Sequence, residues 1–221
     1  MKLIIEALTK FACGVLLVGF LIFLPAGTLD YTYGWLMMGI LFIPMLIAGF
    51  VMLAKSPDFL RKRLDAKEKQ GKQKGVVAFS GLMFVAGFVV SGLDYRFGWS
   101  QMPGWVNIAA SVVFLLDYGL YAEVMRENAY LSRTVKVEEG QNVVDTGLYG
   151  IVRHPMYAVT IELFMMMPLV LGSWYAMIVF AFYPVAIVVR LKDEEELLTR
   201  ELPGYEDYKK KVKWRLLPFV W

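Results

Sequence analysis

Residues 141–157, QNVVDTGLYGIVRHPMY, lead from a polar segment directly into an apolar one. This stretch holds His154, the only histidine of the chain, where charged and polar residues give way to hydrophobic ones. Pro155 suits the first turn of a helix, because its missing N–H group is not needed there. We therefore expect a helix to begin at this point, with His154 near its N-terminus and Arg153 just before it.

The rest of the chain is too apolar for an ordinary soluble domain, because 58% of its 221 residues are hydrophobic and only 19% are charged. Apolar runs occupy residues 11–24, 35–54, 76–92, 105–122, 156–172 and 174–189. They are continuously apolar, which is typical of membrane-spanning helices and argues against a β-barrel, whose strands alternate. We expect an all-α integral-membrane protein, a polytopic helical bundle of about five to six spans.

We expect residues 1–221 to form a single membrane domain, with four spans in residues 1–122 and a catalytic region in residues 123–221. The first run has a charged start, as a signal peptide would, but it lacks a small-x-small cleavage pattern. A retained span that stops at Pro25 is therefore favoured over a signal peptide. In the third run, Gly81, Gly87 and Gly92 are expected to allow close approach of neighbouring helices.

The last two apolar runs are each barely long enough to cross a bilayer, and Gly172 and Ser173 separate them. They predict a helical hairpin whose second arm is kinked at Pro184. Beyond it we expect cytoplasmic C-terminal helices: one helix, a turn at Pro203 and Gly204, and then a basic helix ending near Pro218.

The distribution of basic residues indicates how the spans are oriented in the membrane. The loop of residues 55–75 carries eight of them against three acids: Lys55, Arg61, Lys62, Arg63, Lys67, Lys69, Lys72 and Lys74. The loop of residues 94–104 carries only Arg96. By the positive-inside rule, both termini and the site are expected to face the cytoplasm. A nucleic-acid patch is the less favoured interpretation of the basic loop.

One histidine and one cysteine, Cys13, leave too few ligands for a typical zinc site, so we expect no metal.

A second charged cluster, RLKDEEE at residues 190–196, follows the last apolar run. Arg190 and Glu194 are four residues apart and therefore share one face of a helix. Because the hairpin folds back, we expect this face to lie beside residues 153–157. A solvated salt bridge is the competing interpretation of the pair, and an arginine that reaches the lipid headgroups is the competing interpretation of Arg153.

If the two clusters meet, their side chains indicate what they would bind. Carboxylates such as Glu194 and Glu195 suit ribose hydroxyls or an amino group, and tyrosine rings suit an adenine or a cation. Arg190 suits a carboxylate or a phosphate. Two further acids, Asp117 and Glu162, lie within apolar runs, where acids are candidates for function or for satisfied structural pairs.

The chain resembles the isoprenylcysteine carboxyl methyltransferase family, which is related in this region to the phospholipid methyltransferases. The family signature is Arg-His-Pro-x-Tyr, a hydrophobic stretch, and then Glu-Glu. The matching residues are Arg126-Glu127-Asn128, Gly147-Leu148-Tyr149, Arg153-His154-Pro155-Met156-Tyr157, Arg190 and Glu194-Glu195. The resemblance covers roughly the last hundred residues. The chain departs from the family at Leu148, where a proline is usual, at Gln141, where a histidine is common, and at Val159, where a glycine is common.

The resemblance implies S-adenosyl-L-methionine as cofactor, held in a cytoplasm-facing pocket, and a lipidic or prenylated acceptor that is methylated on a carboxylate. The implied cofactor-binding residues are Gln141, Asn142, Val143, Val144, Tyr149, His154, Pro155, Met156, Tyr157 and Glu194. The implied catalytic residues are Arg190, Arg153 and Glu195. Arg190 would bind the carboxylate of the substrate.

Two other functions remain open. NADPH-dependent sterol-type membrane reductases also carry a His-Pro-x-Tyr motif, and their ending is similar to residues 214–218. Glu194 and Glu195 favour S-adenosylmethionine over NADPH, because a 2′-phosphate would prefer basic partners. In a transporter or scaffold, Asp117 and Glu162 would instead line a path through the membrane.

Overall fold

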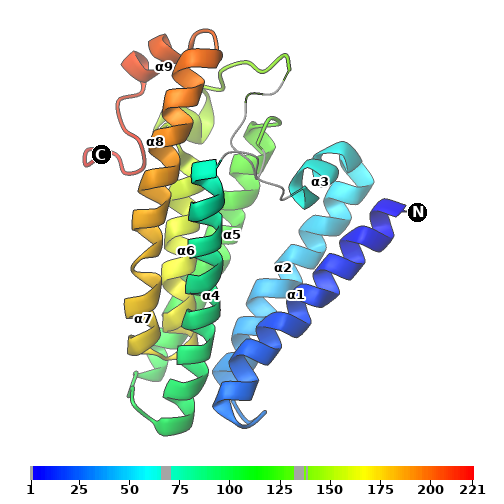
Figure 1. Cartoon of the computed structure of the whole chain (residues 1–221), viewed down its shortest axis with the longest axis vertical. Coiled ribbons are helices and arrows are strands. Elements are labelled where there is room, and N and C mark those ends of the chain that lie inside the picture. Colours follow the sequence, from blue (N-terminus) through cyan, green and yellow to red (C-terminus); the bar gives the residue numbers. More distant parts are fainter. Residues whose placement is uncertain (1, 66–70, 132–136, 138) are drawn as a thin grey trace.

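A computed structural model describes residues 2–65, 71–131, 137 and 139–221, and in this part of the chain the regular structure is entirely helical (Figure 1). Lys67 and Lys69, two residues of the basic loop, lie outside the described residues. The all-α architecture expected from the apolar runs is confirmed.

Within the described residues, five helical segments are long and apolar enough to cross a membrane. They are α1 (Lys2–Ala26), α2 (Thr32–Lys55), α4 (Gly71–Phe97), α5 (Gly104–Glu127) and the pair formed by α7 (Trp174–Phe180) and α8 (Tyr183–Glu201). Helix α6 (Pro155–Leu171) is apolar but has only 17 residues. At a rise of about 1.5 Å per residue, α6 is about 25 Å long. The protein is therefore a multi-pass membrane protein with five to six spans, as expected.

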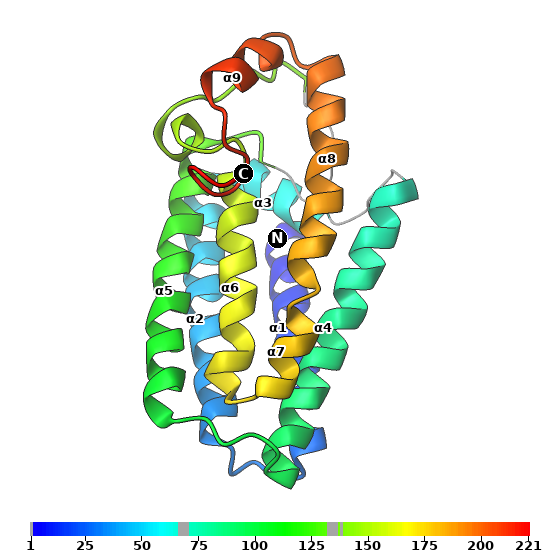
Figure 2. The ribbon, with the colours of Figure 1, turned by 90° about the vertical axis from the view of Figure 1, so that its left-hand side faces the viewer.

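The expected hairpin is formed by α6, α7 and α8, which lie side by side with α4 and α5 (Figure 2). Gly172 ends α6 in the left-handed region, with a φ of 78°. Buried Asp94 of α4 accepts a hydrogen bond from the Ser173 hydroxyl, which ties the turn of the hairpin to the end of α4. The second arm, expected to kink at Pro184, is interrupted after Phe180, and Pro184 lies in the first turn of the new helix α8.

Pro25 does not end the first span, contrary to expectation. Helix α1 continues through Pro25 to Ala26. The next residue, Gly27, has a φ of 69°, and its N–H donates to the carbonyl oxygens of Phe23 and Leu24 at 3.0 and 3.1 Å. A glycine in the left-handed region satisfies the last carbonyls of a helix and ends it. Gly27 is thus the residue at which the helix stops.

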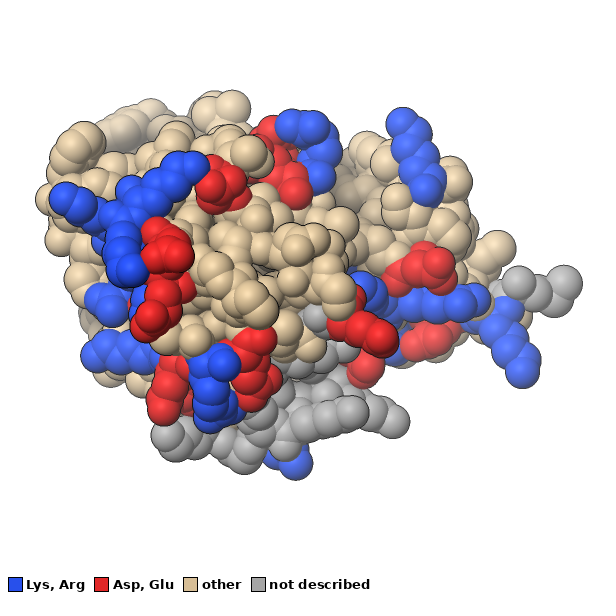
Figure 3. Space-filling view, turned by 90° about the horizontal axis from the view of Figure 1, so that it is seen from above, with Lys and Arg blue, Asp and Glu red and all other residues tan. Residues whose placement is uncertain are grey.

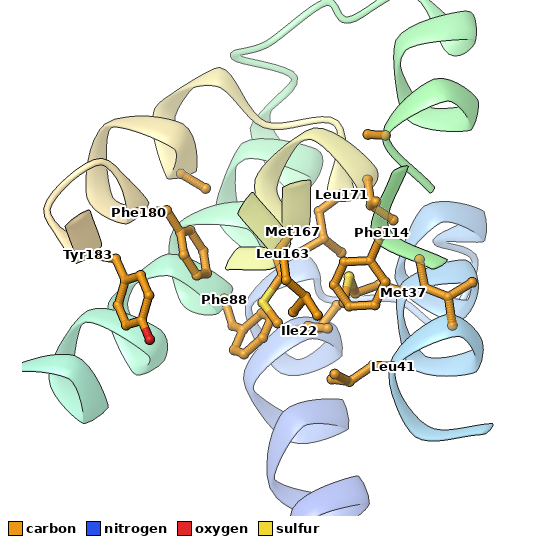
Figure 4. Close-up of a cluster of buried hydrophobic side chains, with 14 of the residues drawn as sticks. Ile22, Met37, Leu41, Phe88, Phe114, Leu163, Met167, Leu171, Phe180 and Tyr183 are labelled. Atoms are coloured by element: carbon orange, nitrogen blue, oxygen red, sulfur yellow. The ribbon is translucent and has the colours of Figure 1, made fainter. Parts of the chain in front are cut away.

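The spans pack around a core of aliphatic and aromatic side chains from all of them (Figure 4). Two of the three glycines singled out in α4 make close approaches: a Cβ at Gly87 would overlap the ring of Phe180, and a Cβ at Gly92 would overlap the Ile22 carbonyl oxygen. Gly81 has no atom within 4 Å of the place where its Cβ would be. The expectation of a close approach is therefore wrong for Gly81, which lies on an exposed face of α4.

Gly87→Ala is expected to destabilise the bundle by about 1–3 kcal/mol, the usual cost of overpacking a core. The Phe180 ring is fully buried and packs edge-on against Phe84 and Phe88, so it has no open space into which to move. The measurement is the midpoint of thermal unfolding in detergent. Gly81→Ala on the same helix is the matched control and should keep or slightly raise the midpoint, because alanine favours a helix more than glycine does. Equal midpoints for the two variants would contradict the packing.

Helices α3 (Pro57–Leu64) and α9 (Tyr205–Lys211) lie at the same end of the bundle as both ends of the chain (Figures 1 and 2). We call this the pocket end, and Figure 3 looks onto it, where charged side chains of both signs surround uncharged ones. The basic helix expected to end near Pro218 ends at Lys211 instead. The residues after it turn back and bond to the segment that precedes α6.

Candidate functional site

The start of α6 is built from Arg153, His154 and Pro155. His154 is the N-cap residue, Pro155 lies in the first turn, and Arg153 precedes the helix, as expected. Two backbone N–H groups of this segment bond to the C-terminal tail: Arg153 donates to the Trp214 carbonyl and His154 to the Arg215 carbonyl, each at 2.9 Å. The tail therefore fixes the position from which His154 faces the pocket.

A buried carboxylate, Glu195 of α8, holds this segment from the other side. Its Oε1 accepts from Arg153 Nε at 2.7 Å and lies 3.3 Å from His154 Nε2, while its Oε2 accepts from Arg215 Nε at 2.7 Å. The Arg153 guanidinium also donates to the backbone oxygens of Val212 and Lys213, at 2.7 and 2.9 Å. A buried arginine needs this number of partners, since an unpaired buried charge is very costly.

In the first turn of α6, Tyr157 joins the two charged clusters. Its hydroxyl donates to Glu194 Oε2, and Arg190 Nε donates to the same hydroxyl at 3.0 Å. The face of α8 that carries Arg190 and Glu194 therefore lies beside the start of α6, as expected from the hairpin. A carboxylate and a guanidinium stand side by side, connected through one phenol.

These groups line a pocket with an empty volume of about 780 Å³, its open mouth included. Of the expected cofactor-binding residues, nine line it: Gln141, Asn142, Val143, Val144, Tyr149, His154, Met156, Tyr157 and Glu194. Pro155 is buried but is not part of the lining. Of the expected catalytic residues, Arg190 and Arg153 line the pocket, whereas Glu195 lies behind it and lines a shallow hollow on the outer surface.

Sequence reasoning missed a further part of the lining: Asn128, Tyr130, Leu131, Leu198, Leu202, Tyr205 and Tyr208. A signal for two of them was present in the sequence. Leu198 and Leu202 continue in steps of four from Arg190 and Glu194, so they extend the same helical face. Tyr205 and Tyr208 of α9 belong to a tail that resembles the ending of the family, but their place at the pocket depends on how the chain turns at Gly204, whose φ is 85°.

The tyrosines around the pocket are held by hydrogen bonds. The Tyr149 hydroxyl accepts from Asn128 Nδ2 at 3.1 Å, and the Tyr208 hydroxyl donates to the Tyr149 carbonyl at 2.8 Å. The Tyr205 hydroxyl lies 3.5 Å from His154 Nε2. Burial raises the pKa of Tyr149, Tyr205 and Tyr208 well above the usual tyrosine value. These phenols therefore stay protonated at neutral pH and remain hydrogen-bond donors.

The loop before the site is fixed by Glu127 at the end of α5. Glu127 Oε2 accepts from the Leu148 backbone N–H at 3.0 Å. Gly147 has a φ of 49°, and a Cβ there would overlap the Glu127 carboxylate. The glycine is therefore required where the loop passes this acid on its way to Tyr149.

The two intramembrane acids do not belong to this lining. Asp117 is buried in α5 and its Oδ2 has no hydrogen-bond partner, whereas Glu162 is exposed on α6. No group of His, Cys, Asp and Glu among the described side chains is arranged to hold a metal ion.

Comparison with known proteins gives a match to a protein-family model. Residues 108–200 match the model of the isoprenylcysteine carboxyl methyltransferase (ICMT) family, and no curated protein matches the chain. The matched residues run from α5 to the end of α8 and include His154, Tyr157, Arg190 and Glu194. The match confirms the resemblance carried by the two-part signature, and it shows similarity to the family over residues 108–200, less than half of the 221-residue chain.

Proposed function

We propose that the protein is an integral-membrane methyltransferase that uses S-adenosylmethionine to methylate a carboxylate on a lipidic or prenylated acceptor. The observation that carries the proposal is the Tyr157 hydroxyl, which bonds to both Glu194 and Arg190 at the wall of one pocket. An acidic partner for a cationic cofactor thus stands beside a basic partner for an anionic acceptor. The match of residues 108–200 to the family supports methyltransferase activity in general, and the proposal adds the cofactor and the acceptor class.

The residues of the pocket fit this cofactor. Glu194 suits ribose hydroxyls or an ammonium group, and the rings of Tyr149 and Tyr157 suit an adenine or a cation. Val143, Leu198 and Leu202 give the pocket an apolar wall. When bound, S-adenosylmethionine supplies an electrophilic methyl group on a positively charged sulfur.

The chain itself has to position the acceptor and exclude water. Arg190 would bind the acceptor carboxylate through two N–H groups, a geometry for which a guanidinium is well suited. A carboxylate is already a nucleophile, so no residue has to remove a proton from it. The Tyr157 hydroxyl donates a hydrogen bond to Glu194 and accepts one from Arg190, so the phenol helps to hold the two charged side chains next to each other. Holding both reactants in line would supply most of the rate enhancement.

Arg153 and Glu195 are proposed to support the reaction by positioning. Their ion pair, buried beneath the pocket, fixes the first turn of α6, and through it His154 and Tyr157. The lining residues that the structure describes all lie between Asn128 and Tyr208. This supports a catalytic region in residues 123–221 and an anchoring role for residues 1–122.

The pocket end is proposed to face the cytoplasm, together with both ends of the chain. It carries the basic residues of α3 and α9, whereas the opposite end carries Arg96 alone among lysines and arginines of the described residues. Such an asymmetry sets orientation by the positive-inside rule. The acceptor would then be methylated at the cytoplasmic face, with its apolar part in the bilayer.

The pocket lining favours this function over an NADPH-dependent reductase. The lysines and arginines among the described lining residues are Arg153 and Arg190. Arg153 is engaged by Glu195 and by two backbone oxygens, and Arg190 lies beside Glu194, with both side chains bonded to the Tyr157 hydroxyl. A 2′-phosphate carries up to two negative charges and would lie near Glu194, so its binding here would be unfavourable.

The test is calorimetry on detergent-purified protein with S-adenosylhomocysteine and with NADPH. S-adenosylhomocysteine should bind and NADPH should not. Glu194→Ala removes a charged acceptor, so it should weaken S-adenosylhomocysteine by about 1.5–3 kcal/mol, roughly 10- to 150-fold. His154→Ala should also weaken it. Glu162→Ala on the exposed face of α6 is the matched control and should bind like the wild type. Binding of NADPH without S-adenosylhomocysteine would overturn the proposal.

A further inference from the structure

The tail after α9 returns from the pocket to the membrane-spanning part of the bundle. Leu216 is buried and belongs to the same core cluster as Tyr157 and Leu191, and Trp221 packs against this cluster. Leu191 lies at the end of the apolar part of α8. In both ribbon views the C-terminal end lies below α9, beside the upper parts of α6 and α8 (Figures 1 and 2). The tail thus lies at the level where the apolar surface of the spans ends.

At this level the tail exposes three large apolar side chains. Leu217, Phe219 and Val220 are 57%, 86% and 73% exposed, and Phe219 is more exposed than any other large hydrophobic residue of the described chain. Clustered exposed apolar residues mark a surface that contacts a partner or a membrane. Because the lipid-facing surface of the spans begins at the same level, the bilayer is the partner that this cluster meets.

A strained backbone conformation places the cluster at the surface of the tail. Phe219 has a φ of 64°, a left-handed conformation that is strained for a bulky residue and is often found at functional sites. The turn is closed by the backbone oxygen of Trp221, which accepts from the N–H groups of Arg215 and Leu216 at 2.8 and 3.0 Å. These bonds fix the turn, with Phe219 at its outer surface.

The residues beside the cluster suit a membrane interface. Lys210, Lys211 and Lys213 are exposed just before it, and Trp214 packs against the Phe219 ring. Apolar side chains flanked by lysines and tryptophans are typical of segments that lie in the headgroup region with their apolar side among the acyl chains.

We propose that residues 214–221 form an interfacial membrane anchor, in which Leu217, Phe219 and Val220 insert into the leaflet at the pocket end. The same segment supplies the carbonyl groups of Trp214 and Arg215 that bind the start of α6, and the Arg215 side chain that binds Glu195. Contact with lipid therefore holds in place the residues that support His154.

The test uses the tryptophans of the tail as reporters. Trp35, Trp99, Trp105 and Trp174 are replaced by phenylalanine, which leaves Trp214 and Trp221, and the protein is placed in lipid nanodiscs. Lipids brominated near the top of the acyl chains should quench the remaining emission strongly, and iodide in the water should quench it weakly. When Leu217→Ser, Phe219→Ser and Val220→Ser are added, iodide should quench the emission strongly and brominated lipid should quench it weakly.

Conservative replacements, Leu217→Ile, Phe219→Leu and Val220→Ile, should keep the wild-type pattern and serve as the matched control. Strong quenching by iodide and none by brominated lipid in the unchanged tail would overturn the anchor. The protein could also form a dimer that shows this iodide-dominated quenching and that the triple serine variant dissociates. That result would assign the cluster to contact between two copies of the chain, and it would also overturn the membrane anchor. The readout needs neither cofactor nor turnover, so it is independent of the proposed methyltransferase function.

Discussion

Glu195→Ala is expected to cause the largest loss of stability of any substitution considered for this protein. Glu195 is 7% exposed and is the acid that pairs with the buried Arg153. Its removal would leave a guanidinium buried without a counter-charge, which costs about 3–5 kcal/mol. The midpoint of thermal unfolding in detergent should therefore fall steeply, and S-adenosylhomocysteine should no longer protect the protein against heat.

Glu196→Ala is the matched control, because Glu196 is the next residue on α8 and is exposed. A second variant separates charge from packing. In the double variant Arg153→Met and Glu195→Leu, the buried charges are both removed, and stability should recover in part. Recovery should stay incomplete, because Val212 and Lys213 lose the donor that their backbone oxygens now have. Equal midpoints for Glu195→Ala and Glu196→Ala would refute the role of the buried pair.

Arg190→Ala is expected to abolish most of the methyltransferase turnover while the affinity for S-adenosylhomocysteine stays close to that of the wild type. Truncating one partner of a buried charged pair costs about 2–5 kcal/mol, roughly 30- to 4,000-fold in rate. The measurement is transfer of a labelled methyl group to a prenylcysteine or another lipidic carboxylate, combined with calorimetry. Turnover equal to that of the wild type would remove the proposed substrate contact.

Two comparison variants sharpen this result. Lys192→Ala changes an exposed basic residue of the same helix and should leave turnover unchanged. Tyr157→Phe removes the hydroxyl that bonds to both Arg190 and Glu194. It should therefore lower both cofactor affinity and turnover, whereas Arg190→Ala lowers turnover alone. This difference distinguishes an acceptor contact from a general disturbance of the pocket.

The parts of the fold that depend on local sequence were predictable. Continuous apolar runs indicated the spans, Gly172 and Ser173 indicated the hairpin, and Pro155 indicated the start of α6. The meeting of Arg190 and Glu194 with Tyr157 followed from the hairpin and from the four-residue spacing. Periodicity also accounts for the different place of Glu195: neighbouring residues on a helix point about 100° apart, so Glu195 cannot share the face of Glu194.

The parts that depend on contacts distant in sequence were not predictable. Nothing in the sequence of the tail indicates that it turns back, because the bonds that hold it are made with Arg153 and His154 of another segment. The same holds for Tyr205 and Tyr208, which reach the pocket only through the turn at Gly204. Pro25 was misplaced as a helix end because a nearby glycine offered a better one. In each case a distant or competing partner decided the local structure.

The bonds between Arg153 and the tail have a consequence for biosynthesis. Arg153 and Lys213 are 60 residues apart, so the ribosome completes the start of α6 well before it makes the segment that binds it. Until then the backbone N–H groups of Arg153 and His154 lack the carbonyl oxygens they bind in the finished protein. The spans can enter the bilayer one after another, but the site is assembled only after synthesis has passed residue 215. A nascent chain halted before that residue would be inserted in the membrane and yet remain without a formed pocket.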